Sequence, residues 1–420
     1  MGVTQSLYKN ISERVYEFNK SSGNNGVPGI QLILLGIILS ILSSSLTLKY
    51  LHKQKFKSSI KPLPAKLANN KERRWGHWKP ELFKAPIPKP YPDWDFKTTR
   101  PIPYRAFKHK YFVNMGIRSM DWNEWIELDN EWQKYHDLKL HRIATKNEQL
   151  YGTEPEARPA ALELLNEFYQ YLPNRYPKLF KQTTIGLDNL VTGESFNFFD
   201  HPLQEDPMLM IAKLIQDDIA VMVELEDGNY YLKAGAIMLA GFWRLKDKLH
   251  LCLSDIHTSG DVPKYSTHLK AGMEKFFQRQ TCDKPVVRNN YFIQTDNNLA
   301  WSDSIGDESN DSIGWYTAPK VKNIENCYFR SERQSVRRLP ISGAMIFTVR
   351  TYFLPVEELC KEPFVPRRLF DGINSWDEDV KEYKGYELFK DILMPYLEKK
   401  AKEQELQGYT IENEKNCYPY

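Results

Sequence analysis

The sequence predicts an α+β fold in which helices cover one face of an antiparallel sheet, and it predicts a single transmembrane helix ahead of that fold. Apolar and polar residues alternate in several segments, as in half-buried strands, and two of these segments flank an Asp-Gly turn. Helical segments precede, separate and follow the strands, an order typical of α+β folds. A long uncharged segment near the amino terminus predicts the membrane helix.

The uncharged segment comprises residues 27–48, after an amino-terminal segment of residues 1–26. Its length of roughly 20 residues matches a hydrocarbon layer of about 30 Å at 1.5 Å per residue. Lysines alone follow it, whereas mixed charges precede it, so the positive-inside tendency predicts a single-pass protein with a cytosolic body. Gly2 and Ser6 also fit the N-myristoylation pattern, although a myristoylated Gly2 conflicts with this orientation.

Residues 49–110 are basic and rich in proline, which predicts an extended tether along an anionic membrane face. Four aromatic residues in its later part are expected to dock onto the body: Trp75, Trp78, Trp94 and Phe96. The body is predicted over residues 111–400, and residues 401–420 form a carboxy-terminal tail.

Within the body, caps and periodicity place helices near Trp125–Trp132, from Pro159, around Met208–Ile211, from Tyr265, and over Asp377–Glu405. The predicted strands are Ile219–Leu225, Tyr230–Met238, Val286–Thr295, Cys327–Val336 and Ala344–Phe353. The first two strands flank Glu226-Asp-Gly-Asn229, so they form a hairpin. The predicted helices are expected to pack on one face of the antiparallel sheet that these strands form.

Composition excludes several classes of function. The net charge of +3 gives no global attraction to nucleic acid. The five cysteines are dispersed and form no C-x-x-C pair, which argues against zinc ribbons, iron–sulfur sites and disulfide frameworks. No P-loop or dinucleotide fingerprint is present, so any redox chemistry needs electrons from another protein.

Arginines are concentrated between Phe329 and Leu354, in segments that otherwise have the pattern of buried strands. Buried guanidinium groups need anionic partners, so the cluster indicates an anion site. Alternation places Arg330, Glu332 and Gln334 on one face and Arg333 on the other. Arg337 and Arg338 follow the predicted strand end, and their side chains are expected to point toward a cleft. A structural network of ion pairs is the alternative interpretation.

His257 ends an apolar run and precedes a turn containing Gly260 and Pro263. A histidine on such a rigid frame can ligate a metal or a haem iron, although a structural turn histidine has the same pattern. Asp217 and Asp218 form a second candidate, because paired carboxylates can act as acid and base. A role in capping and turns fits the two aspartates equally.

These features together resemble the haem-dependent oxidative N-demethylase α-subunit-like family, which occurs in bacteria and fungi. The matching motifs include Trp125-Ile-Glu-Leu-Asp129, Leu172-Pro-Asn-Arg-Tyr-Pro177, Gln216-Asp-Asp218, Ile256-His257 with Val262-Pro263, Val287-Arg-Asn-Asn-Tyr291, Arg330-Ser-Glu-Arg-Gln-Ser-Val-Arg-Arg-Leu-Pro340 and Phe347-Thr-Val-Arg-Thr-Tyr352. The resemblance extends over roughly residues 111–396 and does not include the predicted anchor and tether.

The resemblance implies a PAS-like domain that binds haem b and oxidises a small amine with O₂, using electrons from flavin and iron–sulfur partner proteins. It implies no flavin, iron–sulfur or nicotinamide site in this chain. His257 would be the proximal ligand of the haem iron. The propionate partners would come from Arg333, Arg337, Arg338 and Arg350, and Arg330, Glu332 and Tyr352 would shape the substrate side.

Two other functions fit parts of the sequence. A PAS-like haem sensor or scaffold would bind haem without turnover. A type II membrane glycosyltransferase would have a single anchor and a D-x-D metal motif, which Asp93-Trp-Asp95 imitates. This motif lies in the proline-rich segment and not at the end of a core strand, and the charge bias does not predict a lumenal body.

Overall fold

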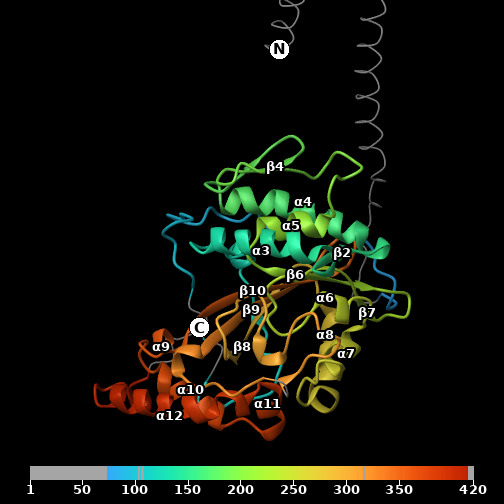
Figure 1. The fold of residues 1–420 in the computed structure, drawn as a ribbon. Coiled ribbons are helices and arrows are strands. Elements are labelled where there is room, and N and C mark those ends of the chain that lie inside the picture. Colours follow the sequence, from blue (N-terminus) through green and yellow to red (C-terminus); the bar gives the residue numbers. More distant parts are fainter. Residues whose placement is uncertain (1–72, 103–104, 106–107, 316–317, 415–420) are drawn as a thin grey trace, which may run out of the picture. The chain divides into compact units, whose positions relative to one another are not determined.

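The computed structural model describes residues 73–102, 105, 108–315 and 318–414, and its architecture is α+β (Figure 1). The central sheet has seven strands, and every neighbouring pair is antiparallel. Across the sheet the strands are β1 (Arg118–Ser119), β8 (Val286–Gln294), β9 (Tyr328–Arg338), β10 (Met345–Pro355), β6 (Asp218–Glu224), β7 (Tyr230–Ala236) and β2 (Tyr151–Thr153). The predicted α+β class and antiparallel sheet are therefore confirmed.

Two hairpins form the centre of the sheet. β6 and β7 are joined through the predicted Asp-Gly turn, where Gly228 has a φ of 82° that favours glycine. β9 and β10 pair along their whole length, from Arg338 opposite Met345 to Tyr328 opposite Pro355. The predicted strand end at Val336 is thus wrong, because pairing with β10 continues through both following arginines.

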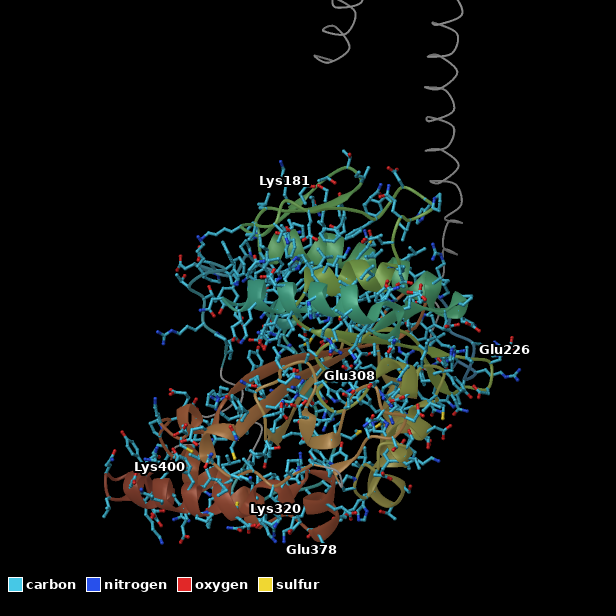
Figure 2. All side chains as sticks on the ribbon, in the orientation of Figure 1. Lys181, Glu226, Glu308, Lys320, Glu378 and Lys400 are labelled. Atoms are coloured by element: carbon cyan, nitrogen blue, oxygen red, sulfur yellow. The ribbon has the colours of Figure 1, made fainter. Side chains whose placement is uncertain are left out.

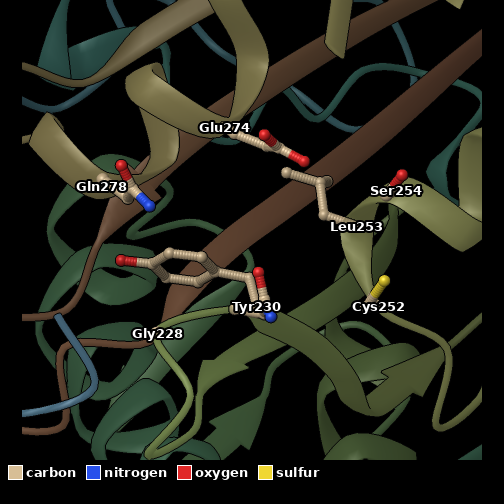
Figure 3. A pocket seen from close by; sticks show the side chains of 8 residues that line it. Gly228, Tyr230, Cys252, Leu253, Ser254, Glu274 and Gln278 are labelled. Atoms are coloured by element: carbon tan, nitrogen blue, oxygen red, sulfur yellow. The ribbon is translucent and has the colours of Figure 1, made fainter. Parts of the chain in front are cut away.

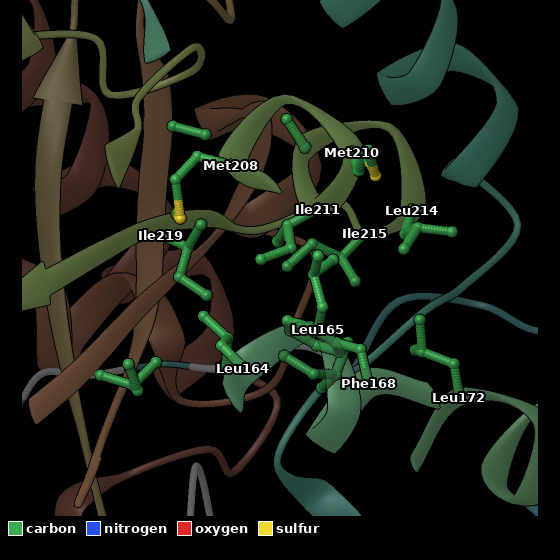
Figure 4. Packing of buried hydrophobic residues seen from close by; sticks show 14 of the residues in the cluster. Leu164, Leu165, Phe168, Leu172, Met208, Met210, Ile211, Leu214, Ile215 and Ile219 are labelled. Atoms are coloured by element: carbon green, nitrogen blue, oxygen red, sulfur yellow. The ribbon is translucent and has the colours of Figure 1, made fainter. Parts of the chain in front are cut away.

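Three helices cover one face of the sheet: α3 (Trp132–Lys146), α4 (Arg158–Arg175) and α5 (Pro207–Leu214) (Figure 1). Figure 4 shows Leu165 and Phe168 of α4 beside Ile211 of α5, with Ile219 of β6 in the same cluster. A small sheet of β3 (Phe180–Gln182), β4 (Gly186–Asn189) and β5 (Ser195–Asn197) lies beyond α4. Burial of large apolar side chains, each contributing about 1.5–3 kcal/mol, stabilises this layer.

Helices also cover the other face of the sheet. They are α6 (Leu245–Lys248), α7 (Leu253–Thr258), a π-helical turn (Tyr265–Leu269) and α8 (Lys270–Arg279). Their core includes Leu253 and Phe277 with Ala220 and Met222 of β6. The expectation of helices on one face only is therefore wrong, because β6 carries apolar side chains on both faces.

Four helices follow the sheet: α9 (Val356–Leu359), α10 (Val365–Asn374), α11 (Glu378–Tyr383) and α12 (Tyr386–Glu405). They pack against the carboxy-terminal end of β8 and the amino-terminal end of β9. This second hydrophobic core includes Ile293 and Phe329. The predicted helix over Asp377–Glu405 is divided at Gly385, which has a φ of 64°. The described residues also contain short 3₁₀ turns: Trp122–Glu124, Asn147–Gln149, Pro155–Ala157, Asp303–Ile305, Ile324–Asn326 and Ile411–Asn413.

The helix predicted near Trp125 is shorter than expected. Asp121 caps only a 3₁₀ turn, where its carboxylate accepts the amide of Asn123, and the α-helix begins at Trp132. Residues 158–175 form the helix predicted from Pro159, and the helix predicted from Tyr265 begins as a π-helical turn.

Part of the predicted tether packs on the body. Trp94 is buried, and its indole N–H donates to the carbonyl of Leu128 at 2.7 Å. The indole of Trp78 donates to the carbonyl of Pro340 at 3.0 Å. The later part of the predicted tether thus docks onto the body, as its aromatic side chains predicted.

The predicted anchor at residues 27–48, and Gly2 with its myristoylation pattern, lie outside the described residues. Among the helices that the structure does describe, none combines the length and the apolar character needed to cross a bilayer.

Candidate functional site

Strand alternation separates the predicted site residues into two groups on opposite faces of the sheet. The register pairs Arg350 with Arg333 and Tyr352 with Ser331, so these side chains share the face covered by α3, α4 and α5. Arg337 lies on the same face. Arg330, Glu332 and Arg338 lie on the face covered by α7 and α8. The predicted separation of Arg330 and Glu332 from Arg333 is confirmed.

Carboxylates hold the first group in a buried network. Arg350 donates to the carboxylate of Asp129 at 2.6 Å, and the hydroxyl of Tyr352 donates to Glu127 at 2.7 Å. The Nε atom of Arg333 lies 3.4 Å from the other carboxylate oxygen of Glu127. Asp129 keeps the pKa of the Arg350 guanidinium high despite its burial. The alternative interpretation, a network of ion pairs, describes these residues.

Arg337 and Arg338 also have protein partners. Arg337 donates to Glu167 at 2.9 Å and stacks over Trp125, with 4.3 Å from guanidinium carbon to ring centroid. Arg338 donates to the carbonyls of Gln280 and Gly343, each at 2.7 Å. The prediction that the four arginines bind haem propionates therefore gains no support from their positions.

His257 lies near the end of α7 in a defined orientation. Its Nδ1 lies 2.7 Å from the carbonyl oxygen of Leu253, which can only accept, so Nδ1 carries the proton. The ring stacks on Tyr265 with 4.9 Å between centroids and an angle of 11°. Burial lowers the pKa of His257, which favours the neutral ring with a lone pair on Nε2. Within the described residues, Nε2 has no hydrogen-bond partner.

Arg288 lies on β8. After burial, its positive charge also lowers the pKa of His257. Its Nη1 donates to the side-chain oxygen of Gln334 at 3.0 Å. In the described part of the chain it forms no ion pair, and its buried Nε has no hydrogen-bond partner. Glu332 opposes the lowering of the Arg288 pKa by burial.

Glu332 is held by neutral donors and lies near further cations. Gln334 donates to its carboxylate at 2.8 Å and Asn290 does so at 3.5 Å. The Nε atom of Arg330 lies 3.9 Å away, but the terminal nitrogens of that arginine donate to the carbonyls of Leu239 and Leu299. Arg330 therefore holds the backbone at Leu239 and Leu299 and also lies close to the Glu332 carboxylate.

Lys384 is a buried lysine that contacts Asn290 and Tyr291 of β8. Its Nζ donates to the carbonyl of Tyr291 at 2.6 Å and lies 4.2 Å from the ring centroid of Phe292. Burial lowers the pKa of Lys384 to about 7, while the charge of Glu332 acts to raise it. A cation close to Glu332 thus gains or loses its charge near neutral pH.

Sequence reasoning did not assign Arg288 or Lys384 to the site. The motif Val287-Arg-Asn-Asn-Tyr291 contained the first of them, and alternation along β8 places Arg288 beside Gln334 of β9. The sequence around Lys384 contains no pattern that predicts its role. Lys384 lies between α11 and α12, and the break in the helix at this point places it near β8.

The other sequence candidates have structural partners. Asp218 accepts the amides of Met238 and Leu239 at 2.9 and 2.8 Å. Asp95 of the D-x-D motif accepts the amide of Lys97 at 2.8 Å, as in a capped turn. Asp217 differs, because neither of its buried carboxylate oxygens has a hydrogen-bond partner in the described part of the chain.

Figure 3 shows a small pocket beside α7, with Tyr230, Leu253 and Gln278 around it. Its volume is about 20 Å³, and a second pocket beside Arg244 has a volume of about 10 Å³. Ligand pockets for drug-sized molecules have volumes of roughly 300–1,000 Å³. Each of these two pockets is therefore suited to about one water molecule.

A family model described as haem-dependent oxidative N-demethylase, alpha subunit-like, matches residues 116–394. The matched range includes His257, Arg288, Glu332 and Lys384, and it ends within α12. It covers more than half of the chain.

Proposed function

Because the chain belongs to the haem-dependent oxidative N-demethylase α-subunit-like family, we propose that it binds haem b and uses O₂ to remove a methyl group from a small amine. The orientation of His257 is the observation that supports this proposal most directly. Its Nδ1 proton is held by the carbonyl of Leu253 at 2.7 Å, so the Nε2 lone pair is available for iron. Histidines that ligate metals have this arrangement.

The donor chemistry around His257 fits haem. Haem carries two propionates, and the guanidinium of Arg288 has no carboxylate partner in the described residues. In the proposal His257 would hold the haem iron through Nε2, and Arg288 would pair with a propionate. Neither of the two small pockets is large enough for haem, so the haem would need space that these two pockets do not provide. Bound haem would supply the redox-active iron at which O₂ is reduced.

Glu332 is the residue proposed to bind the amine. An alkylammonium ion would be attracted by its carboxylate, whose position is fixed by Gln334 and Asn290. In the proposal, the protonation state of Lys384 changes the net charge beside Glu332. When Lys384 is neutral, the negative charge of Glu332 is less compensated and attracts a cationic substrate more strongly. Arg330 has a positioning role here through its 3.9 Å approach to Glu332. Tyr352 lies on the other face of the sheet, where its hydroxyl donates to Glu127 at 2.7 Å.

A separate reductase supplies the electrons in this proposal, since the chain contains no P-loop or dinucleotide fingerprint. Residues 27–48 would anchor the protein in a membrane, with the body on the cytosolic side.

The test is amine-dependent O₂ consumption and formaldehyde release by the haem-loaded protein, with dimethylamine as the probe and a surrogate reductase. Glu332→Gln should raise KM for the amine by about tenfold or more, because a charge-assisted contact is lost. Glu167→Gln, which alters an acid on the opposite face, is the matched control and should leave KM unchanged. Haem-loaded protein that consumes no O₂ with the amine would favour a haem sensor instead.

A further inference from the structure

Among the described residues, two lysines are buried, Lys139 and Lys384, and each is 1% exposed. The ammonium of Lys139 donates to two backbone carbonyls, at 3.0 and 2.6 Å. Lys384 has one close acceptor, the carbonyl of Tyr291 at 2.6 Å, and its Nζ lies 3.4 Å from the side-chain oxygen of Asn290. In the part of the chain that the structure describes, Lys384 forms no ion pair. Its amine therefore lacks a carboxylate bonded directly to it, which a buried ammonium normally needs.

Aromatic rings surround the amine of Lys384. Four ring centroids lie between 4.2 and 5.8 Å from its Nζ, those of Phe292, Tyr291, Trp376 and Tyr111. Ring faces attract an ammonium only weakly compared with the hydration that it loses on burial. Burial lowers the pKa of Lys384 to about 7, and the charge of Arg288 acts in the same direction. A neutral amine has a free lone pair, so it can attack a carbonyl carbon.

Asn290 connects this amine to the proposed substrate site. Its side-chain nitrogen donates to the carboxylate of Glu332 at 3.5 Å, and its side-chain oxygen faces Nζ of Lys384. The amine is thus one side-chain amide away from the carboxylate that is proposed to bind the substrate. Lys139 belongs to α3, which covers the opposite face of the sheet from Glu332. Only one of the two buried lysines therefore lies beside the proposed site.

We propose that Lys384 captures formaldehyde beside Glu332 as a reversible imine. The inference rests on the proposed function, because a methyl group removed oxidatively from an amine leaves as formaldehyde. The Nζ lone pair forms a bond to the carbonyl carbon, and the π electrons of the C=O bond move to oxygen, which takes one proton from the nitrogen. Loss of this hydroxyl with the second nitrogen proton gives Nζ=CH₂ and one water molecule. No electrons are gained or lost, and addition of water releases the aldehyde again.

Reductive labelling of the full-length protein before haem is added tests this inference. At pH 7, ¹³C-labelled formaldehyde forms the imine, and cyanoborohydride transfers a hydride to it, which leaves a stable labelled methyl group that peptide mass spectrometry locates. With pKa values of about 7 and about 8, roughly half of Lys384 and roughly a tenth of Lys139 are neutral at this pH. Lys384 should therefore be labelled about fivefold faster than Lys139, the equally buried control.

Lys181 is the control for exposure. It lies on the surface of the small sheet (Figure 2). The lysine side chain in water is almost entirely an ammonium ion at pH 7. Lys384 should be labelled about tenfold or more faster than Lys181. Labelling of Lys384 no faster than that of either control lysine would overturn the inference.

A second measurement identifies the source of the aldehyde. Haem-loaded protein with a surrogate reductase receives dimethylamine that carries ¹³C methyl groups, in place of formaldehyde. Label should again appear on Lys384 before it appears on Lys181, and turnover without label on Lys384 would refute capture of the product. Absence of turnover would contradict the proposed function alone, because labelling by added formaldehyde before haem is added does not depend on it.

Discussion

Replacing Asp217 by asparagine should stabilise the protein at neutral and alkaline pH. Asp217 is 1% exposed, and its carboxylate oxygens have no hydrogen-bond partner in the described part of the chain. Burial raises its pKa from 3.8 to about 7, although the charges of Arg350, Arg333 and Lys139 act in the opposite direction. The native state therefore resists the ionisation that the unfolded chain undergoes freely.

The size of the effect follows from proton linkage. A folded-state pKa above the unfolded value means that the native state binds the proton more tightly between pH 4 and pH 7. With a rise of about three units, ionisation of Asp217 costs about 4 kcal/mol at pH 8 and under about 2 kcal/mol at pH 5. The penalty disappears below the unfolded pKa. The Asp217→Asn variant should thus gain about 2 kcal/mol more at pH 8 than at pH 5.

Urea unfolding of the purified protein at pH 5 and pH 8 measures this difference. Asp218→Asn is the matched control, because Asp218 accepts two backbone amides at 2.9 and 2.8 Å that an asparagine cannot fully satisfy. The control should lower the free energy of unfolding by about 1–3 kcal/mol. If Asp217→Asn destabilises the protein equally at both pH values, the inference that its buried carboxylate has no compensating partner is refuted.

Substitutions at Arg288, Gly343 and Tyr352 test other parts of the structure. Arg288→Ala should weaken haem binding by about tenfold in a haem titration while Arg288→Lys retains part of the affinity, and equal affinities would exclude a propionate contact. Gly343→Ala should lower the free energy of unfolding by about 2 kcal/mol or more, because φ is 72° and a Cβ would lie 2.2 Å from Trp78. Gly193→Ala, with φ of 75° and open space, should cost only about 1 kcal/mol, and equal losses would contradict the packing of Trp78. Tyr352→Phe should cost about 1 kcal/mol of stability without changing turnover per haem, whereas a selective loss of turnover would return Tyr352 to the substrate side.

Local sequence patterns predicted the strands well because the pattern of each strand depends on its own residues. Alternation correctly separated Arg330 and Glu332 from Arg333, and the Asp-Gly pair marked the β6–β7 turn. The same reasoning ended β9 too early at Val336. The extra pairs form with β10, which supplies partners that no local pattern contains.

The partners of the arginines could not be predicted, because they are distant in sequence. Arg350 meets Asp129, 221 positions away, and Arg337 meets Glu167, 170 positions away. A list of arginines in one segment cannot distinguish internal ion pairs from a haem contact. Arg288 was present in a recognised motif, but its electrostatic effect on His257 depends on how α7 packs against the sheet, where it contacts β7.

A titration of the purified protein with haem shows whether His257 ligates the iron. We predict a saturable Soret band at one haem per chain that shifts on reduction and on addition of CO. His257→Ala should abolish or shift this band, while His250→Ala, which changes an exposed histidine, should leave it unchanged. A protein that gives no saturable band would refute haem binding, and a His257→Ala variant with the wild-type spectrum would refute ligation by His257.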